Sequence, residues 1–581
     1  MAEVLLSPGV LARENDQSFL QAQPAQAGAA IVGPTVKGPV GIPTLVTTYS
    51  QYQNKFGTKI ESGSAEYTYF TSISAYNYFQ QGGDSLLVTR VASGSYTSAV
   101  STAVSNSLDT TSFVLETLSE GTNQNSTSTE GTSGQLPSGS VDNIRWEITS
   151  PNLSTGTFAL LIRRGDDITT SKSILETWPG LSLDPNASNY IEKVIGNSKQ
   201  TVAEDNGEYY IKNDGTYNTL SNYVRVKSVN TPTLNYFDNA GIAKDAFTGS
   251  IPVAASGTFG GAVGTPFTNA TTAKFYDTID LTNTQGFDSA ALTDTSSPGT
   301  YTVALNLLAN QDLYSYNLIT APGLIRGFTN PATLLTTMVT TAQTRGDNLA
   351  IIDLVKYDSE IAEVTSGVTD IDSSYATTYW PWLQTIDPDR GGQVWVPAST
   401  MIPGVYAFND RAGEPWFAPA GLNRGGLATV LRAERNLTNG NRNTLYEANV
   451  NPIATFPNTG VVVFGQKTLQ KKASALDRVN VRRLLIELKS YISQVADNLV
   501  FEQNTIATRN TFLSQVNPYL ESVQQRQGLF AFKVVMDDSN NTPDVIDRNE
   551  LVGQIYLQPT KTAEFIYLDF NVLPTGATFP V

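Results

Sequence analysis

Two residue types are missing from the 581-residue sequence, which contains no cysteine and no histidine. Without cysteine the chain forms no disulfide and carries no thiol nucleophile. Without histidine it lacks the commonest metal ligand and the commonest general base near neutral pH. Ser-His-Asp triads, Cys-His pairs and histidine-based zinc sites are therefore excluded. The chemistry that remains is that of carboxylates, lysine, tyrosine and oxygen-ligated Ca²⁺ or Mg²⁺.

Charged residues are also scarce. They make up 15% of the chain, against about 25% in an average soluble domain, while hydrophobic residues make up 40%. This composition is typical of a chain that buries much of its surface against partners, and equally of a β-rich virion or extracellular protein with a Ser/Thr/Asn-rich exterior. The net charge is −16, so the chain as a whole repels nucleic acid and anionic lipid. We expect no direct nucleic-acid partner.

Long hydrophobic runs are absent as well. The first residues, MAEVLLSPGVLAREND, contain an apolar stretch of only three residues, and Glu3 stands where a signal peptide has basic residues. No segment approaches the roughly 18 apolar residues that a membrane helix needs. The sequence therefore predicts a soluble protein, made in the cytoplasm and without membrane insertion.

The patterns that are present predict a mixed α/β and α+β multidomain fold. Residues 1–24 are punctuated by proline and glycine and lack helical periodicity, so we expect an extended arm. Residues 25–96 and 300–445 alternate buried-strand runs with helices, which predicts a middle α/β core domain. Residues 97–299 are rich in Ser, Thr, Asn and Gly between strand-like runs, which predicts inserted β-rich domains on the outside. Residues 446–581 predict a C-terminal α+β domain that ends in a second arm.

Helix ends carry their own signals. Asn330 fits the N-cap and Pro331 the first position of a helix that Gly346 ends. Apolar residues at helical spacing predict another helix over residues 481–499. A further helix follows it, and Gly528 is well placed as the C′ residue of that helix.

Two motifs resemble ligand sites but lack residues that the chemistry needs. In GVVVFGQKT (460–468), Gln466 stands where a phosphate-binding loop has the lysine that reaches the phosphates. In DDSNNTPDVIDR (537–548), Thr542 replaces the glycine of a calcium loop and Arg548 replaces its bidentate glutamate. The first segment is predicted to be a strand and the second a polar loop.

Paired carboxylates offer a third possibility. Asp166 and Asp167 could do acid–base work in a cleft, but adjacent acids are far more often a solvated turn, and we interpret them so. We therefore predict no catalytic residue, no cofactor and no metal site, and we do not expect an enzyme.

Positive charge is concentrated in one segment, KKASALDRVNVRRLLIELK (471–489). The candidate residues are Lys471, Lys472, Arg478, Arg482 and Arg483. Arg478 and Arg482 are four positions apart and so share a helix face. Two interpretations stay open, namely a solvated helix face and a docking surface for an acidic partner, because complementary charge sets register and partner choice.

Many segments resemble, in order, those of one protein family. Near the C-terminus they are SALDRVNVRRLLIELK, VFEQN, NNTPDVIDRNELVG and KTAEFIYLDF. Upstream they are APGL, TRGDNLAIID, YATTYWPWLQ, IPGVYAFNDRAGEPWFAPAGLNRG and NVNPIATFPNTG, and near the start SPGV, VGPTVKGPV and YNYFQQGGDSLLVTRV. Together they resemble the tail sheath proteins of contractile-tailed phages, of the large myovirus type. The resemblance covers most of the chain outside roughly residues 97–175 and 230–300.

This resemblance implies a structural protein of the virion. Sheath subunits form hexameric rings that stack helically around a tail tube, and the stack contracts to drive the tube through the host envelope for genome ejection and host cell entry. The implied partners are further copies of the chain, the tail tube protein, and baseplate and tail terminator proteins. The implied location is the virion tail, assembled in the host cytoplasm.

The resemblance also implies how subunits join. Extended terminal arms pair as strands with the C-terminal domains of neighbouring subunits. The residues expected in these arms are Val4, Leu5, Leu6 and Val10 at one end and Phe570, Val572 and Leu573 at the other. The basic segment then becomes the candidate for gripping an acidic tube.

Other functions stay open at this point. The same family serves contractile injection systems and bacteriocins, so the chain could be a sheath of that kind. It could also be another virion protein, such as a baseplate or adhesin subunit. A carboxylate glycosidase carried by the inserted β-domains is a third possibility.

Overall fold

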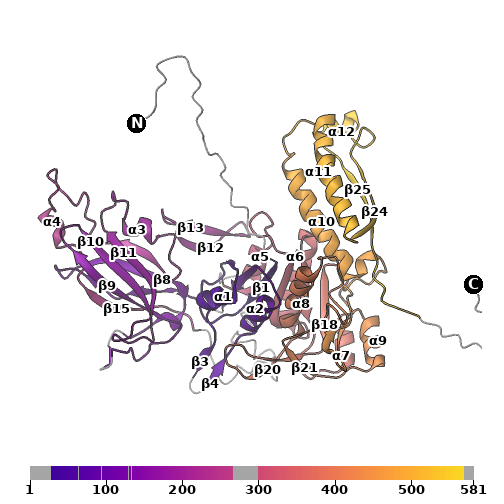
Figure 1. Ribbon diagram of the computed structural model, residues 1–581, viewed down its shortest axis with the longest axis horizontal. Coiled ribbons are helices and arrows are strands. Elements are labelled where there is room, and N and C mark those ends of the chain that lie inside the picture. The colour runs from indigo at the N-terminus through magenta and orange to yellow at the C-terminus, as the bar shows by residue number, and fades with distance from the viewer. Residues whose placement is uncertain are drawn as a thin grey trace, which may run out of the picture.

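The computed structural model describes residues 28–62, 65–92, 94–127, 130–131, 134–265 and 299–567. It is a mixed α/β multidomain structure in which an outer β unit and a central α/β unit lie side by side along the longest axis, and a C-terminal unit projects from the central unit across that axis (Figure 1). The chain passes from the central unit into the outer unit and returns to complete the central sheet. None of the helices in the described ranges is both long and apolar enough to cross a membrane.

The central unit is built on an eight-stranded sheet of order β2-β5-β1-β16-β17-β18-β22-β23. The strands from β5 to β22 run parallel, and the two end strands are antiparallel to their neighbours. Their bounds are β1 (Ala29–Gly33), β2 (Thr44–Val46), β5 (Leu86–Arg90), β16 (Leu318–Ile325), β17 (Leu349–Asp353), β18 (Ala376–Trp380), β22 (Asn451–Phe456) and β23 (Gly460–Val463). Because parallel strands are buried on both faces, they need helices on both sides.

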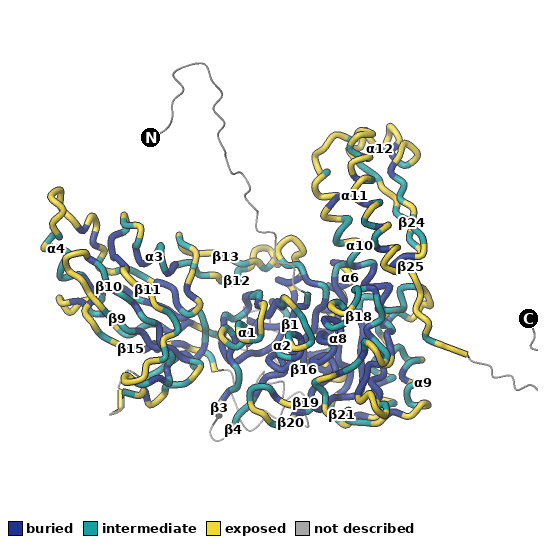
Figure 2. The backbone as a smooth tube through the Cα atoms, in the orientation of Figure 1, coloured by how far each residue is buried: buried dark blue, intermediate teal, exposed yellow. Residues whose placement is uncertain are grey.

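Helices supply that cover on both faces. Alternate residues of β1 point to opposite faces, so Ile31 joins the core under α2 (Phe70–Gln80) and α8 (Ala398–Ala412). Ala30 joins the core under α5 (Tyr301–Leu307) and α6 (Thr329–Arg345). The remaining elements of this unit are α1 (Tyr49–Phe56), β3 (Ile60–Ser62), β4 (Ala65–Tyr67), α7 (Ile361–Ser366), β19 (Leu383–Ile386), β20 (Gln393–Val396), β21 (Val430–Ala433) and α9 (Asn439–Glu447). Figure 2 shows this unit as the most deeply buried part of the chain.

The structure corrects the predicted start of α6 and confirms its predicted end. The helix begins at Thr329 with Phe328 at the N-cap, so the prediction of Asn330 as the cap is wrong by two residues. Phe328 packs against the apolar core, and that tertiary contact sets the entry of the chain. The other end is confirmed, because Gly346 adopts a left-handed φ of 73° as the terminating residue.

The outer unit is an antiparallel sheet of order β11-β10-β9-β15-β6-β8-β14, with β7 also pairing β8. The bounds are β6 (Ser98–Ser101), β7 (Val104–Ser105), β8 (Thr111–Glu120), β9 (Ile144–Asn152), β10 (Thr157–Arg164), β11 (Ile174–Ser182), β14 (Val224–Val229) and β15 (Ala255–Gly260). A single core containing Trp146, Phe113 and Phe158 fills it. Shorter elements are α3 (Ile191–Val194), the hairpin β12 (Lys199–Asp205) and β13 (Glu208–Asp214), and α4 (Asp245–Thr248). Residues 266–298 of the predicted insertion lie outside the described residues.

The C-terminal unit is a helical hairpin beside a two-stranded sheet. Its elements are α10 (Val479–Asp497), α11 (Ile506–Gln525), β24 (Leu529–Val535), α12 (Pro543–Asp547) and β25 (Gln554–Pro559). Apolar residues at helical spacing, including Leu484, Leu488, Val516 and Leu520, form its core. The two helices predicted here are therefore present.

Two expectations about the C-terminal half need correction. A domain boundary at residues 445 and 446 would remove β22 and β23 from the sheet that they complete, so the break lies after β23. The strand predicted within GVVVFGQKT is confirmed as β23. Gly528 does not supply the left-handed residue after α11, since Gln527 does so with a φ of 63°. Gly528 is required instead by close packing, because a Cβ there would lie 2.6 Å from Val523 Cγ1.

Candidate assembly surface

The sheet of the C-terminal unit is open at both edges. In the part of the chain that the structure describes, β24 and β25 pair only with each other. Phe532, Val534 and Leu557 face the helices and join their core, whereas Tyr556, opposite Lys533, is exposed. A sheet edge presents unpaired N–H and C=O groups that can accept another strand. This unit can therefore take up one strand on each side.

A tryptophan from the central unit fixes this sheet in place. Trp416 is buried in the core of the C-terminal unit, and its Nε1 donates to the carbonyl of Arg526 at 3.1 Å. The Arg526 guanidinium lies 4.9 Å from the centroid of the indole and pairs with Glu414 at 3.0 Å. The open sheet is thus carried on a firmly attached unit.

Two of the predicted docking residues are buried at the contact between the C-terminal unit and the central unit. Arg482 and Arg483 are each only 4% exposed. Arg483 donates to both carboxylate oxygens of Asp410, at 2.8 and 2.5 Å, and Arg482 stacks 4.0 Å from the centroid of Tyr375. Burial alone lowers the pKa of Arg483, but the Asp410 carboxylate outweighs it and the pKa is raised. The prediction that these two residues face a partner is wrong, because the fold turns them inward against the central unit.

Arg478 has a partner that the sequence did not indicate. Its Nε donates to Glu564 Oε1 at 2.8 Å, and the same carboxylate accepts from Gln466 Nε2 at 3.0 Å and from the Tyr446 hydroxyl. Burial raises the pKa of Glu564, but these donors outweigh it and the pKa is lowered. A carboxylate held by three donors fixes the backbone here, shortly before the segment expected to form the C-terminal arm.

The other predicted residues divide into two groups. Lys471 and Lys472 are exposed, and their role toward a tube stays a prediction. The arm candidates Val4, Leu5, Leu6, Val10, Phe570, Val572 and Leu573 all lie outside the described residues.

A cavity of about 440 Å³ lies beside the Glu564 anchor. Phe464 and Phe565 give it an apolar lining, and Tyr446 and Arg442 of α9 line it as well. The Arg442 guanidinium lies 5.4 and 5.6 Å from the ring centroids of Phe456 and Phe464. The cavity is therefore an aromatic pocket with a cation at its wall.

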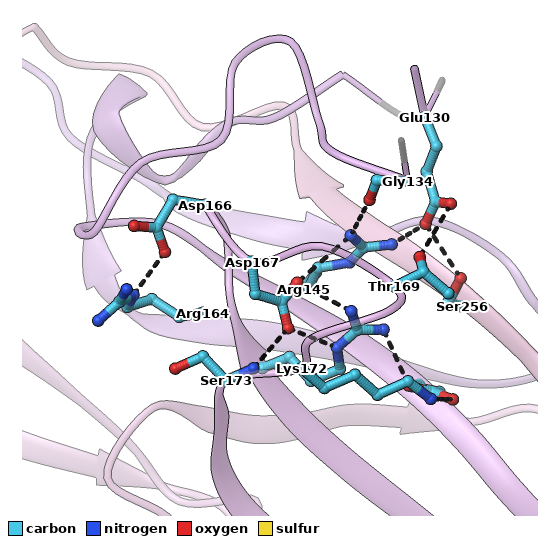
Figure 3. A network of polar contacts seen from close by, with 12 residues as sticks. Glu130, Gly134, Arg145, Arg164, Asp166, Asp167, Thr169, Lys172, Ser173 and Ser256 are labelled. Carbon is cyan, nitrogen blue, oxygen red and sulfur yellow. Dashed lines mark hydrogen bonds and ion pairs between the residues drawn. The ribbon is translucent and has the colours of Figure 1, made fainter. Parts of the chain in front are cut away.

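The outer unit contains a different kind of polar cluster (Figure 3). Arg145 and Arg163 are both buried, and the side chain of Asp167 is 0% exposed. Arg163 donates to the two oxygens of Asp167 at 2.7 and 2.9 Å and to Glu147 at 2.9 Å. The interpretation of Asp166 and Asp167 as a solvated turn is wrong for Asp167, because the strands around it supply two arginines.

The same cluster also binds Glu130 and Gly134, which lie between β8 and β9. Arg145 donates to the carbonyl of Gly134 at 3.2 Å and to the Glu130 carboxylate. Glu130 in turn accepts from Thr169 at 3.3 Å. Each buried charge here faces an opposite charge from its own domain, so the cluster braces the fold.

Family models match both parts of the C-terminal half. Residues 299–469 match the phage tail sheath protein central domain, and residues 471–573 match the phage tail sheath C-terminal domain. These matches place residues 299–573, the C-terminal half of the chain, in the phage tail sheath family. This is a family of structural sheath proteins, and the first match covers the central sheet from α5 through β23.

Individual tail sheath proteins are similar over part of this chain. That of Vibrio phage KVP40 is 39% identical over 210 residues, which are 36% of this chain and 31% of the relative. That of Enterobacteria phage T4 is 34% identical over 230 residues, 40% of this chain and 35% of the relative. The chain thus spans about a third of the length of these relatives.

Solved structures show more distant likenesses. A sheath tail protein from Listeria innocua is 10% identical with a TM-score of 0.49, covering 92% of this chain and 95% of that one. The contracted helical sheath of the anti-feeding prophage is 15% identical with a TM-score of 0.45, covering 98% and 99%. At such scores the domain arrangement of those proteins does not carry over to this chain.

Sequence reasoning missed the two residues that organise the C-terminal half. Glu564 lies 86 positions from Arg478 and 118 from Tyr446, and Trp416 lies 110 positions from Arg526. No spacing rule connects residues that far apart. The available signal was chemical, since an acid and a tryptophan in otherwise apolar segments need buried partners.

Proposed function

We propose that this chain is a structural subunit of a contractile tail sheath. Copies polymerise as stacked hexameric rings around a tail tube and contract to drive the tube through the host envelope. The observation that carries the proposal is the two-stranded sheet β24–β25, open at both edges in a chain of the sheath family. A domain that lacks strands on both sides needs other copies to complete it.

The strands come from neighbouring subunits. Residues 1–24 of one copy and the residues after 567 of another add to the two edges, through main-chain hydrogen bonds that require little sequence specificity. Such contacts join different surfaces of successive copies, and they build an open helical lattice if they do not close on themselves. Contraction is the passage between two packings of this lattice separated by a kinetic barrier. No nucleotide is consumed.

The domains take different positions in this assembly. The C-terminal unit and the central α/β unit, residues 25–96 and 300–581, lie nearest the tube, and the 97–299 insertion decorates the outside. Lys471 and Lys472 face the tube protein. Baseplate and tail terminator proteins bind the two ends of the stack, within a virion tail that is assembled in the host cytoplasm.

Negative-stain electron microscopy of the purified chain tests the proposal. We expect wide hollow tubes with a helical repeat, formed alone or when a tail tube protein is co-expressed as template. A variant lacking residues 1–24 is the matched control, and it should stay as folded, discrete particles. Discrete trimers or monomers of the full chain, even with the tube protein present, would instead favour a baseplate or adhesin subunit.

A further inference from the structure

An aromatic side chain is held out in solvent at the tip of the C-terminal unit. Phe501, in the loop between α10 and α11, is 100% exposed, and its φ of 71° lies in the left-handed region. Val500 and Ile506 beside it are exposed as well. A bulky residue in the left-handed region is strained, and such strain persists where it serves a contact. The loop lies at the end of the unit that points away from the central sheet (Figure 1).

The aromatic pocket beside Glu564 has the volume and the apolar lining to take an aromatic side chain such as that of Phe501. Its 440 Å³ exceeds the volume of one phenylalanine side chain, and Phe464 and Phe565 offer their rings at its wall. Arg442 lines the pocket, lies over the rings of Phe456 and Phe464 and donates to the Asn439 side chain, which is uncharged. Glu502 follows Phe501 directly, so the tip brings an acid to this cation.

The loop that carries Phe501 cannot reach the pocket beside Glu564 in the same chain. Arg478 at the start of α10 contacts Glu564, which lines the pocket, whereas Phe501 lies beyond the other end of that helix. A helix of 19 residues is about 28 Å long at 1.5 Å per residue. The two sites therefore meet only between different copies.

We propose that the Phe501 loop of one copy inserts into the Glu564 pocket of a second copy, with Glu502 against Arg442. The contact is separate from the arm strands, and it rests on the proposed polymerisation. The Phe501 loop and the Glu564 pocket are different surfaces of the chain. The contact therefore joins copies head to tail and adds to an open helical lattice. It also gives the strained φ of Phe501 a role, since the ring is buried only in the assembly.

Disulfide trapping tests this contact directly, because the chain has no cysteine of its own. Phe501→Cys and Asn443→Cys, the second at the wall of the pocket, are made singly and together in the full-length chain. Under mild oxidation the doubly substituted chain should give a ladder of linked copies, and an equal mixture of the two single variants should give dimers. Leu108→Cys, exposed on the outer unit, replaces Asn443→Cys in the control and should give no ladder.

Phe501→Gly then measures what the ring contributes. Glycine accepts the left-handed φ, so the unfolding midpoint should not fall. Loss of one buried aromatic side chain should raise the concentration needed for polymerisation roughly ten- to hundred-fold. An unchanged polymerisation threshold would argue against the contact.

The outcomes separate this contact from the proposed function. Polymers in which residues 501 and 443 fail to cross-link overturn the contact and leave the sheath function standing. Cross-linking of Phe501→Cys to a tail tube protein that carries a surface cysteine, in place of a second copy, also overturns it. A wild-type chain that forms no polymer, alone or on a tube, overturns both.

Discussion

The outer β unit and the C-terminal unit end their sheets in opposite ways. In the outer unit, α3 lies against both β11 and β14, the last strands of the sheet. Ser182 of β11 donates to Asn189 at 3.0 Å and Val226 of β14 donates to Gly196 at 2.9 Å, so the segment between these strands covers both edges. No third strand pairs with β24 or β25 in the described residues. The outer unit thus covers its last strands with its own chain, whereas β24 and β25 each keep, in the described residues, an edge that pairs with no other strand.

Deletion of residues 568–581 should have the largest effect, because it should abolish polymerisation without lowering the stability of the C-terminal unit. The described core of the C-terminal unit lies before these residues, so the variant should unfold at the wild-type temperature. Polymerisation should be lost, because one edge of each β24–β25 sheet then stays empty. Sedimentation of polymer, beside a thermal melt, measures both effects. Equal amounts of polymer from the variant and the wild type would contradict the arm assignment.

Asp167→Asn should destabilise the outer unit and leave assembly unchanged. The substitution removes the carboxylate that both Arg145 and Arg163 contact, and breaking a buried pair in this way costs about 3–5 kcal/mol. Denaturant unfolding followed by tryptophan fluorescence reports it, because Trp146 lies in the core of that unit.

The neighbouring acid is the matched control for that variant. Asp166 pairs with Arg164, whose side chain is 43% exposed, so Asp166→Asn should change the free energy of unfolding by less than about 1 kcal/mol. Equal losses from the two substitutions would show that the buried network does not brace the unit. Loss of polymer from Asp167→Asn would show that the outer unit is not self-contained.

The central sheet, which joins the two units, should respond to pH through Asp353. Its carboxylate is buried at the end of β17 and accepts from Ser399 N at 3.1 Å, and burial raises its pKa to about 7. The folded chain therefore holds this proton more tightly than the unfolded chain, whose aspartates titrate near pH 4. The contribution of Asp353 to stability is present below pH 4 and is lost as the pH rises to 7.

Asp353→Asn should remove that dependence. The amide stays uncharged, so at pH 8 the variant should be more stable than the wild type, by up to about 4 kcal/mol for a shift of about three pKa units. Unfolding in denaturant at pH 5 and pH 8 measures the difference. The same change between the two pH values in both proteins would show that another group is responsible.

The smallest expected effects on stability concern Gly528 and Gln527, which follow α11 in the C-terminal unit. Gly528→Ala should cost about 1–2 kcal/mol, since the new Cβ would meet Val523 at 2.6 Å and Trp416 at 3.0 Å. Gln527→Gly next to it should be neutral or stabilising by up to about 1 kcal/mol, because the left-handed φ of 63° suits glycine. Thermal unfolding distinguishes them, and the reverse order would mean that backbone conformation, not packing against Trp416, selects Gly528.

The sequence by itself determined the elements whose signals are local. The apolar spacing in α10 and α11, the stop of α6 at Gly346, and β23 within GVVVFGQKT follow from helix and strand periodicity and from glycine's freedom at positive φ. Many motifs in order were enough to indicate the sheath family, because that evidence accumulates along the chain.

Only the tertiary structure decided where the charges go. Arg482 and Arg483 look like a basic surface in the sequence, yet Asp410 and Tyr375 lie where the helix packs on the central unit and draw both side chains inward. Asp166 and Asp167 are adjacent, and only the strand register places Asp167 between two arginines. A charge is stable in the interior only if a partner is there. Two of these partners, Asp410 for Arg483 and Arg145 for Asp167, lie tens of positions away and are brought close by the fold alone.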